Sequence, residues 1–306
     1  MRERFVSLGD RELWTRCDGP DDGAPILFVA GANASGLMWP DEFVSLFTSA
    51  GFRVIRYDHR DTGKSTFKRF DEFPYTVEDL AKDAIAVLDG WGIERSHVVG
   101  LSLGATIGQV LALDYPHRLN GITLMCGAAL DVDFVGNIGR AFSGESSTDG
   151  LPLPRKDVLE ALAQRSRSVQ SLDEALEGRI KEWKLLSGHK IPFNPDEFFV
   201  WERRSIEHAG TWELPSNHAF AKPVPLERGK ELRRIAVPTL VIQGAEDPLN
   251  PPPHGRHIAD LIPTARLVEV DGLGHALPGY FHRRIAEEII RHAEQSHAAE
   301  AHASRG

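Results

Sequence analysis

This sequence of 306 residues has few cysteines, no long apolar run and no excess of positive charge. Two cysteines in a chain of this length, Cys17 and Cys126, cannot form a disulfide framework, and no Cys/His spacing resembles a zinc site. No segment approaches the roughly 20 apolar residues of a membrane-spanning helix, and the N-terminus lacks an apolar stretch of signal-peptide length. We therefore expect a soluble, cytoplasmic protein with no membrane partner and no metal.

Basic residues are outnumbered by acidic ones, 35 to 44, which gives a formal net charge of −9. A surface that binds the phosphates of nucleic acid carries the opposite sign, so we expect no nucleic-acid partner. Hydrophobic residues make up 42% and charged residues 26% of the chain, as in average globular proteins, which excludes disordered and fibrous classes. At about 100–200 residues per domain, the length permits one large domain or two ordinary ones.

Short apolar runs alternate with longer helical periods in residues 1–127 and again in 226–306. This alternation is typical of βαβ units and a mostly parallel sheet, so the predicted class is α/β. The predicted strands of these two segments are 11–17, 26–30, 54–57, 97–100, 121–125, 239–242 and 267–270. The predicted helices are 76–91, 105–113, 255–261 and 281–292, and the small, polar residues 293–306 are expected to fray.

Residues 128–225 interrupt the alternation, with helical periods at 158–163, 172–186 and 196–207 but no convincing strand. We interpret this segment as a helical cap domain inserted between the two halves, 1–127 and 226–306, of a single core domain. Below, residues 128–225 are called the cap.

The sharpest local pattern is Gly-Leu-Ser-Leu-Gly at 100–104, which directly follows a predicted strand and directly opens a predicted helix. A nucleophile on such a tight turn needs small neighbours, because side chains at the two glycines would collide with the backbone. At the start of a helix, Ser102 would also have free amide groups near any oxyanion that develops. We predict that Ser102 is a nucleophile; the alternative is a serine that merely caps a helix.

A serine nucleophile needs a base and an orienting carboxylate, in the chain order Ser, then Asp or Glu, then His for this architecture. Asp247 and His275 each stand on a loop just after a predicted strand, at the edge where open α/β sheets build their sites. They are the predicted acid and base. The other candidates for the acid are Glu246, Asp131 and Asp133, with Asp131 the main reserve.

An oxyanion hole would complete this chemistry. Its donors are expected to be the backbone N–H groups of Leu103, which follows the nucleophile, and of Ala32, on the loop after the strand at 26–30. The alternative to the Ala32 amide as a donor is the side chain of Asn33.

These loops, together with Asp-His-Arg-Asp-Thr-Gly-Lys-Ser at 58–65, resemble the α/β-hydrolase family over nearly the whole chain. The resemblance implies the α/β-hydrolase fold, a mostly parallel central sheet flanked by helices, with the Asp58–Ser65 turn in a structural role. One departure concerns the oxyanion loop: most members carry His-Gly before it, whereas this chain has Ala30-Gly31.

A closer resemblance is to the anthracycline-tailoring methylesterases of the aclacinomycin type within that family. The segments that carry it are 39–43, 56–63, 86–92, 184–188, 206–210 and 274–278. It implies hydrolysis of a methyl ester on an aromatic polyketide, with release of methanol and the free acid. The same triad can also catalyse other reactions, so an aminopeptidase, lactonase, thioesterase or perhydrolase activity stays open. A ligand-binding member of the fold without turnover is a further alternative.

The expected partner is a small, hydrophobic ester, because the cap is rich in large aromatic residues that suit a bulky or flat ligand. Asn33, Trp39 and Phe134 are the predicted substrate-binding residues. No cofactor is expected, since Ser/His/Asp acyl transfer needs only water. The sequence does not choose between monomer and homodimer.

Overall fold

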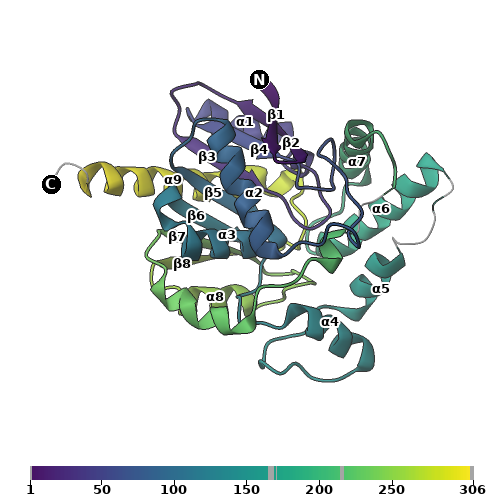
Figure 1. Cartoon of the computed structure of the whole chain (residues 1–306). Helices are drawn as coiled ribbons and strands as arrows, with labels where there is room; N and C mark the ends of the chain where they lie inside the picture. The colour runs from purple at the N-terminus through teal and green to yellow at the C-terminus, as the bar shows by residue number, and fades with distance from the viewer. Residues whose placement is uncertain (1, 165–168, 170, 214–216, 304–306) are drawn as a thin grey trace.

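An eight-stranded sheet forms the centre of the protein in the computed structural model, which describes residues 2–164, 169, 171–213 and 217–303 (Figure 1). The strand order is β1-β2-β4-β3-β5-β6-β7-β8, and the strands from β4 to β8 along the sheet are parallel. The strands are β1 (Arg2–Leu8), β2 (Arg11–Asp18), β3 (Pro25–Val29), β4 (Arg53–Tyr57), β5 (Ser96–Leu101), β6 (Leu119–Met125), β7 (Thr239–Gly244) and β8 (Ala265–Val270). The predicted α/β class and the mostly parallel sheet are confirmed.

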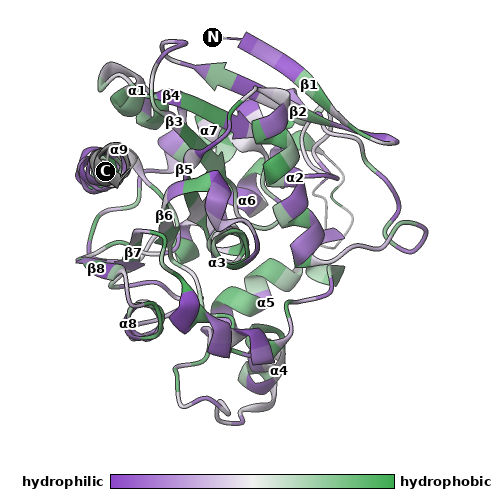
Figure 2. Ribbon diagram, turned by 60° about the vertical axis from the view of Figure 1, so that its left-hand side comes forward, coloured by the Kyte–Doolittle hydropathy of each residue, from purple (hydrophilic) through white to green (hydrophobic). Residues whose placement is uncertain are grey.

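Helices cover both faces of this sheet, because successive side chains of a buried strand point to opposite faces. In β3, Leu27 packs with one hydrophobic cluster and Phe28 with another. The first cluster includes residues of α2 (Val77–Gly90), α3 (Leu103–Asp114) and α8 (His254–Leu261); the second includes residues of α1 (Asp41–Ser49) and α9 (His282–Ala303). Figure 2 shows α1 and α9 to the left of β3, β4 and β5, and α2 and α3 to the right of these strands.

Strand β1 and the end of α9 differ from the sequence prediction. The alternation of β1 is weak because it is an edge strand paired only with β2, and Val6 is its single buried residue. Helix α9 continues to Ala303 through residues expected to fray, since its alanine and glutamate residues favour helix. No helix of the described residues is both long and apolar enough to cross a membrane.

The helices of the cap stand together beside the sheet (Figure 1). They are α4 (Phe134–Ser143), α5 (Lys156–Gln164), α6 (Leu172–Leu186), α7 (Pro195–Ala209) and the short 3₁₀ helix η3 (Asn217–Phe220), all between β6 and β7 in the chain. A second 3₁₀ helix, η4 (Leu226–Arg234), leads back to β7. The division into a core domain and a cap domain at 128 and 225 stays a prediction.

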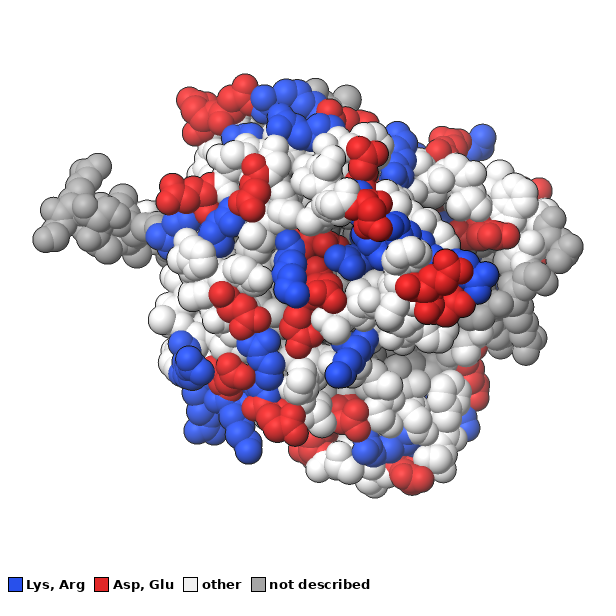
Figure 3. All heavy atoms as spheres, in the orientation of Figure 1, with Lys and Arg blue, Asp and Glu red and all other residues white. Residues whose placement is uncertain are grey.

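Charged residues of both signs are interspersed over the face seen in Figure 3, and blue and red side chains often lie next to each other. Several charged neighbours on the protein surface are ion pairs, such as Arg228 with Asp114 and Arg118 with Asp89.

Candidate active site

Ser102 stands on a strained turn between β5 and α3. Its backbone angles are φ 56° and ψ −116°, a conformation that residues with side chains rarely adopt. The flanking glycines make this turn possible: a Cβ on Gly100 would lie 2.0 Å from the Gly104 carbonyl oxygen, and one on Gly104 would lie 2.3 Å from the Val29 carbonyl oxygen. The turn therefore presents the serine side chain at the end of the sheet instead of burying it in the helix.

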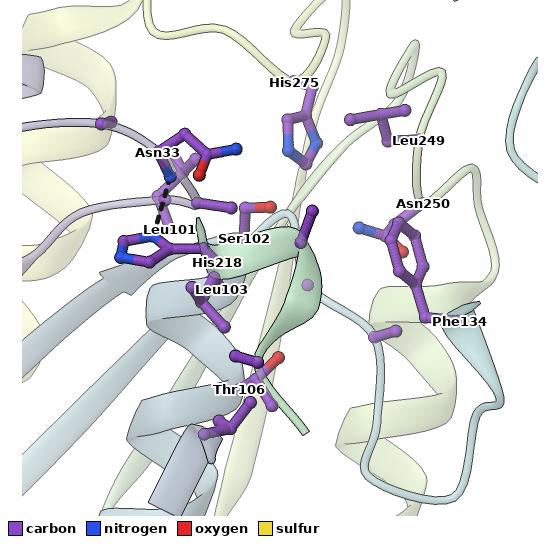
Figure 4. Close-up of a pocket in the computed structure, with 18 of the residues that line it drawn as sticks. Asn33, Leu101, Ser102, Leu103, Thr106, Phe134, His218, Leu249, Asn250 and His275 are labelled. Carbon is purple, nitrogen blue, oxygen red and sulfur yellow. Dashed lines mark hydrogen bonds between the residues drawn. The ribbon is translucent and has the colours of Figure 1, made fainter. Parts of the chain in front are cut away.

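The side chains of His275 and Asp247 lie within hydrogen-bond distance of each other, next to this serine. His275 Nδ1 lies 3.0 Å from both carboxylate oxygens of Asp247, and the side chains are 7% and 0% exposed. Asp247 Oδ1 also accepts the backbone N–H groups of Leu249 (2.8 Å) and Asn250 (2.9 Å), which fixes the carboxylate. With Nδ1 committed to Asp247, Nε2 is the nitrogen left to face Ser102, whose hydroxyl lies below the His275 ring in Figure 4.

The other carboxylates considered from the sequence have partners elsewhere. Glu246 accepts the backbone N–H groups of His189 (2.5 Å) and Lys190 (3.0 Å) in the cap. Asp131 lies 3.0 Å from the ring of His257, and Asp133 caps α4 by accepting the Gly136 N–H at 2.9 Å. Asp247 is thus the carboxylate that the fold brings to His275.

The cap also helps to hold His275, which the sequence did not reveal. The backbone N–H of His275 donates to the Leu186 carbonyl at the end of α6, at 2.6 Å. The preceding Gly274 allows this contact, because a Cβ there would lie 2.1 Å from that same oxygen. No motif predicts a partner in the cap, since the partner atom belongs to the backbone.

The predicted oxyanion loop lies on the other side of Ser102. Ala32 and Leu103 line the cavity above the serine, and Leu103 is the first residue of α3, where amide groups lack partners within the helix. The amide of Asn33 is already used: its N–H donates to His218 Nδ1 at 2.9 Å. The side chain of Asn33 projects into the cavity (Figure 4), and its Oδ1 is buried without a partner among the described residues.

A cavity of about 800 Å³ opens over Ser102 and His275, between the sheet and the cap. Phe134, predicted to bind substrate, lines it at the start of α4. The indoles of Trp183 and Trp201 lie on the α6 and α7 side, with ring centroids 4.7 Å apart. The walls are mostly apolar, with a few polar side chains such as Asn250.

Trp39 does not line this cavity, although the sequence predicted that it binds substrate. It is fully buried in the core, where it stacks on Phe28 at 4.7 Å and on Phe43 at 5.9 Å. The reason is the short 3₁₀ helix η1 (Gly36–Met38), which turns the chain so that Met38 faces the cavity and Trp39 faces the sheet.

The thiol of Cys126 is buried beside the site and has a raised pKa. Burial, together with the negative charge of Asp247, raises the pKa of the Cys126 thiol well above its usual value, so this residue is a neutral thiol. Among the described residues, no group of three or more His, Cys, Asp or Glu side chains is arranged to hold a metal ion.

Comparison with known proteins gives a consistent result. A family model described as alpha/beta hydrolase fold matches residues 24–278. The rhodomycin D methylesterases DnrP of Streptomyces peucetius and DauP of Streptomyces sp. strain C5 are each 46% identical to this chain over 292 residues, which is 95% of this chain and 98% of theirs.

Solved structures agree on the architecture. A hydrolase from Pseudomonas aeruginosa PA01 matches with a TM-score of 0.68 at 25% identity, over 95% of this chain and 97% of that one. A thermophilic esterase from Thermogutta terrifontis matches with a TM-score of 0.70 at 21% identity, over 97% of this chain and 100% of that one. At this identity the match shows a shared fold and nothing more.

Proposed function

This chain belongs to the α/β-hydrolase family, and on that basis we propose that it is a serine carboxylic-ester hydrolase that removes the methyl group from a methyl ester on an anthracycline-type aromatic polyketide. The observation that carries the proposal is the similarity to the two rhodomycin D methylesterases over nearly the full length of all three chains, cap included. The paired His275 and Asp247 beside a serine on a strained turn support the same chemistry.

In the proposed first half-reaction, Ser102 Oγ attacks the ester carbonyl carbon while His275 Nε2 takes the hydroxyl proton. Asp247 accepts the Nδ1–H bond and stabilises the imidazolium that forms. The carbonyl oxygen becomes an oxyanion, which the N–H groups of Leu103 and Ala32 stabilise. The intermediate then collapses, His275 gives its proton to the leaving methoxide, and methanol departs from the acyl-enzyme.

The second half-reaction uses water. His275 takes a proton from a water molecule, the resulting hydroxide attacks the acyl carbon, and the same two amides hold the new oxyanion. When this intermediate collapses, the bond to Ser102 Oγ breaks and His275 returns the proton to the serine. The products are the carboxylic acid and methanol, and the enzyme is restored without any cofactor.

The cavity suits a large, flat and mostly apolar acyl group. Its volume of about 800 Å³ lies in the upper part of the range of about 300–1,000 Å³ for small-molecule sites. The indoles of Trp183 and Trp201 offer aromatic faces, against which a fused ring system stacks favourably.

The proposal is tested with rhodomycin D as substrate, by following methanol release and the mass of the product acid. The wild type is expected to convert the methyl ester, and Ser102→Ala is expected to lose turnover and labelling by a fluorophosphonate probe. Full turnover by Ser102→Ala would remove the serine from the mechanism. Probe labelling without turnover of methyl esters, but with turnover of a lactone, thioester or peptide substrate, would keep the serine and reject the methyl ester.

A further inference from the structure

The oxyanion loop is held by a histidine from the cap. The N–H of Asn33, directly after the proposed donor Ala32, donates to His218 Nδ1 at 2.9 Å, as the dashed line in Figure 4 shows. The other ring nitrogen of His218, Nε2, lies 3.1 Å from the carbonyl oxygen of Arg60. His218 therefore bridges two loops of the core, although it belongs to η3 of the cap.

These contacts fix the protonation state of His218. Because Nδ1 accepts from an amide, it carries no proton, and Nε2–H donates to the Arg60 carbonyl. Burial, with a smaller contribution from the neighbouring His59, lowers the pKa of His218 to about 3. The ring is thus neutral at working pH, and it holds the loop without acting as an acid or a base.

The far end of the same loop is tied to the cap as well. The N–H of Gly36 donates to Asp58 Oδ1 at 2.7 Å, and Asp58 Oδ2 lies 2.7 Å from Nε2 of His208 on α7. Just beyond the loop, Trp201 Nε1, also on α7, donates to the Leu37 carbonyl at 2.6 Å. Three cap side chains therefore hold the loop at 31–36 and the adjoining Leu37, either directly or through Asp58.

The bond to His218 acts on a left-handed turn of the loop. Asn33 has a φ of 61°, a conformation that asparagine adopts more readily than most residues, and its amide in this turn points to His218 Nδ1. No side chain of the two residues before Ala32, Ala30 and Gly31, can hold the loop by a hydrogen bond.

We infer that His218 is a positioning residue for the oxyanion hole, which is complete only while the cap is docked on residues 31–37. Release of the cap breaks the bond from Asn33 to His218 and frees the Ala32 amide to turn away from the tetrahedral intermediate. The inference rests on the proposed function of Ser102, and it adds a conformational requirement: substrate entry by cap opening dismantles the oxyanion hole, and closure rebuilds it.

Three substitutions of His218 separate its two hydrogen bonds. In His218→Asn the side-chain oxygen replaces the Nδ1 acceptor for the Asn33 N–H. His218→Gln reaches toward the Arg60 carbonyl as a donor but carries no acceptor at the Nδ1 position, and His218→Phe fills the volume with neither. We expect kcat for p-nitrophenyl acetate to fall about 10- to 100-fold in the Phe and Gln variants, with KM within about twofold, because the oxyanion forms after binding.

His218→Asn is expected to recover at least about tenfold of the lost kcat. Wild-type kcat in His218→Gln, or Gln and Asn variants that lose kcat equally, would overturn the inference. A rise in KM with unchanged kcat would also overturn it, by making His218 a wall of the pocket. The pH profile of kcat is expected to keep its shape in all three variants, whereas a shifted limb would mean that His218 transfers protons.

Arg204→Met is the matched control. Arg204 on α7 also joins the cap to the core, through Asp41 at 2.6 Å, but Asp41 lies on α1 outside the oxyanion loop. It is expected to leave kcat unchanged. Ser102→Ala is measured in the same assay. Full turnover by Ser102→Ala would overturn the proposed function. An inactive Ser102→Ala together with fully active His218 variants would overturn this inference alone.

Hydrogen exchange on the unaltered protein gives a second test that needs no variant to fold. If one opening event exposes both elements, the amides of 31–36 and the cap helix α7 exchange at matching rates. Slow exchange in the loop with fast, independent exchange in α7 would overturn the inference.

Discussion

At the scale of single residues, one carboxylate decides which nitrogen of His275 carries the proton. Asp247 faces Nδ1 with both oxygens at 3.0 Å and is itself held by two backbone N–H groups. A carboxylate only accepts, so it requires Nδ1–H and leaves Nε2 free to accept from Ser102.

Asp247→Asn is therefore expected to lower kcat by about 10⁴-fold while the fold is retained, because an amide N–H next to Nδ1 selects the wrong tautomer. Steady-state kinetics on an activated ester measures this. Asp131→Asn is the matched control, since Asp131 pairs with His257 and is expected to leave kcat unchanged. The reverse result would make Asp131 the triad acid.

At the scale of elements, the turn from β5 into α3 requires both of its glycines. Each is approached by backbone oxygens, which cannot move aside as a flexible side chain does. The apolar residues of β5 and the helical period of α3 were readable from the sequence, and so was the need for small residues between them.

Gly104→Ala is expected to destabilise the protein by about 1–3 kcal/mol, because its Cβ would overlap the Val29 carbonyl. Urea unfolding, followed by circular dichroism, measures the loss. Gly139→Ala in the middle of α4 is the control: nothing lies within 4 Å of the new Cβ, so a gain of about 0.5–1 kcal/mol is expected. Equal effects of the two changes would contradict the steric argument.

Helices α6 and α7 are joined by a buried ion pair. Arg179 donates to Glu202 at 2.7 Å, with side-chain exposures of 6% and 8%, and the Trp183 indole donates to the same carboxylate. A pair buried in this way contributes little net stability, yet removing one partner leaves the other charge buried without a counter-charge.

Arg179→Met is accordingly expected to lower the free energy of unfolding by about 3–5 kcal/mol. The double variant Arg179→Met/Glu202→Gln is expected to recover part of that loss, since no charge then remains buried. Arg203→Ala, which breaks an exposed pair with Glu207 on the same helix, is the control and is expected to change stability by less than about 1 kcal/mol. Urea unfolding compares the variants, and a double variant less stable than Arg179→Met would contradict the cost assigned to the buried charge.

At the scale of the whole molecule, several histidines are buried in their neutral form. Burial lowers the pKa of His97, well below its usual value, and also that of His59 and His218. His97 Nε2 lies 2.9 Å from the Thr123 hydroxyl between β5 and β6, with His292 and His297 close enough to lower its pKa further.

These shifts predict a loss of stability in mild acid. Below about pH 6.5 the unfolded chain takes up protons on these histidines, whereas the folded chain does not, so protonation stabilises the unfolded state as the pH falls. Urea midpoints measured from pH 7.5 to 5 are expected to decrease. His97→Phe is expected to flatten this decrease, and His189→Gln, at an exposed site, is expected to leave it unchanged. Midpoints that stay constant with pH would contradict the assignment of neutral buried histidines.

The sequence by itself determined the class of fold and the order in which the candidate residues of the site follow one another along the chain. Buried strands of a parallel sheet are apolar runs, and loops at their carboxyl ends meet at one edge, so Ser102, Asp247 and His275 could be assigned to the same edge from local pattern alone. Edge strand β1 could not be predicted in the same way, because a largely exposed strand carries no apolar run.

Only the tertiary structure decided which neighbouring side chains meet. It separated Asp247 from the adjacent Glu246, whose side chain turns to the cap, and it buried Trp39 in the core. It also brought His218 to the amide of Asn33 across 185 positions of sequence. Local sequence sets the backbone of each element, but the direction of a loop side chain and the contacts of the cap depend on packing between segments far apart in the chain.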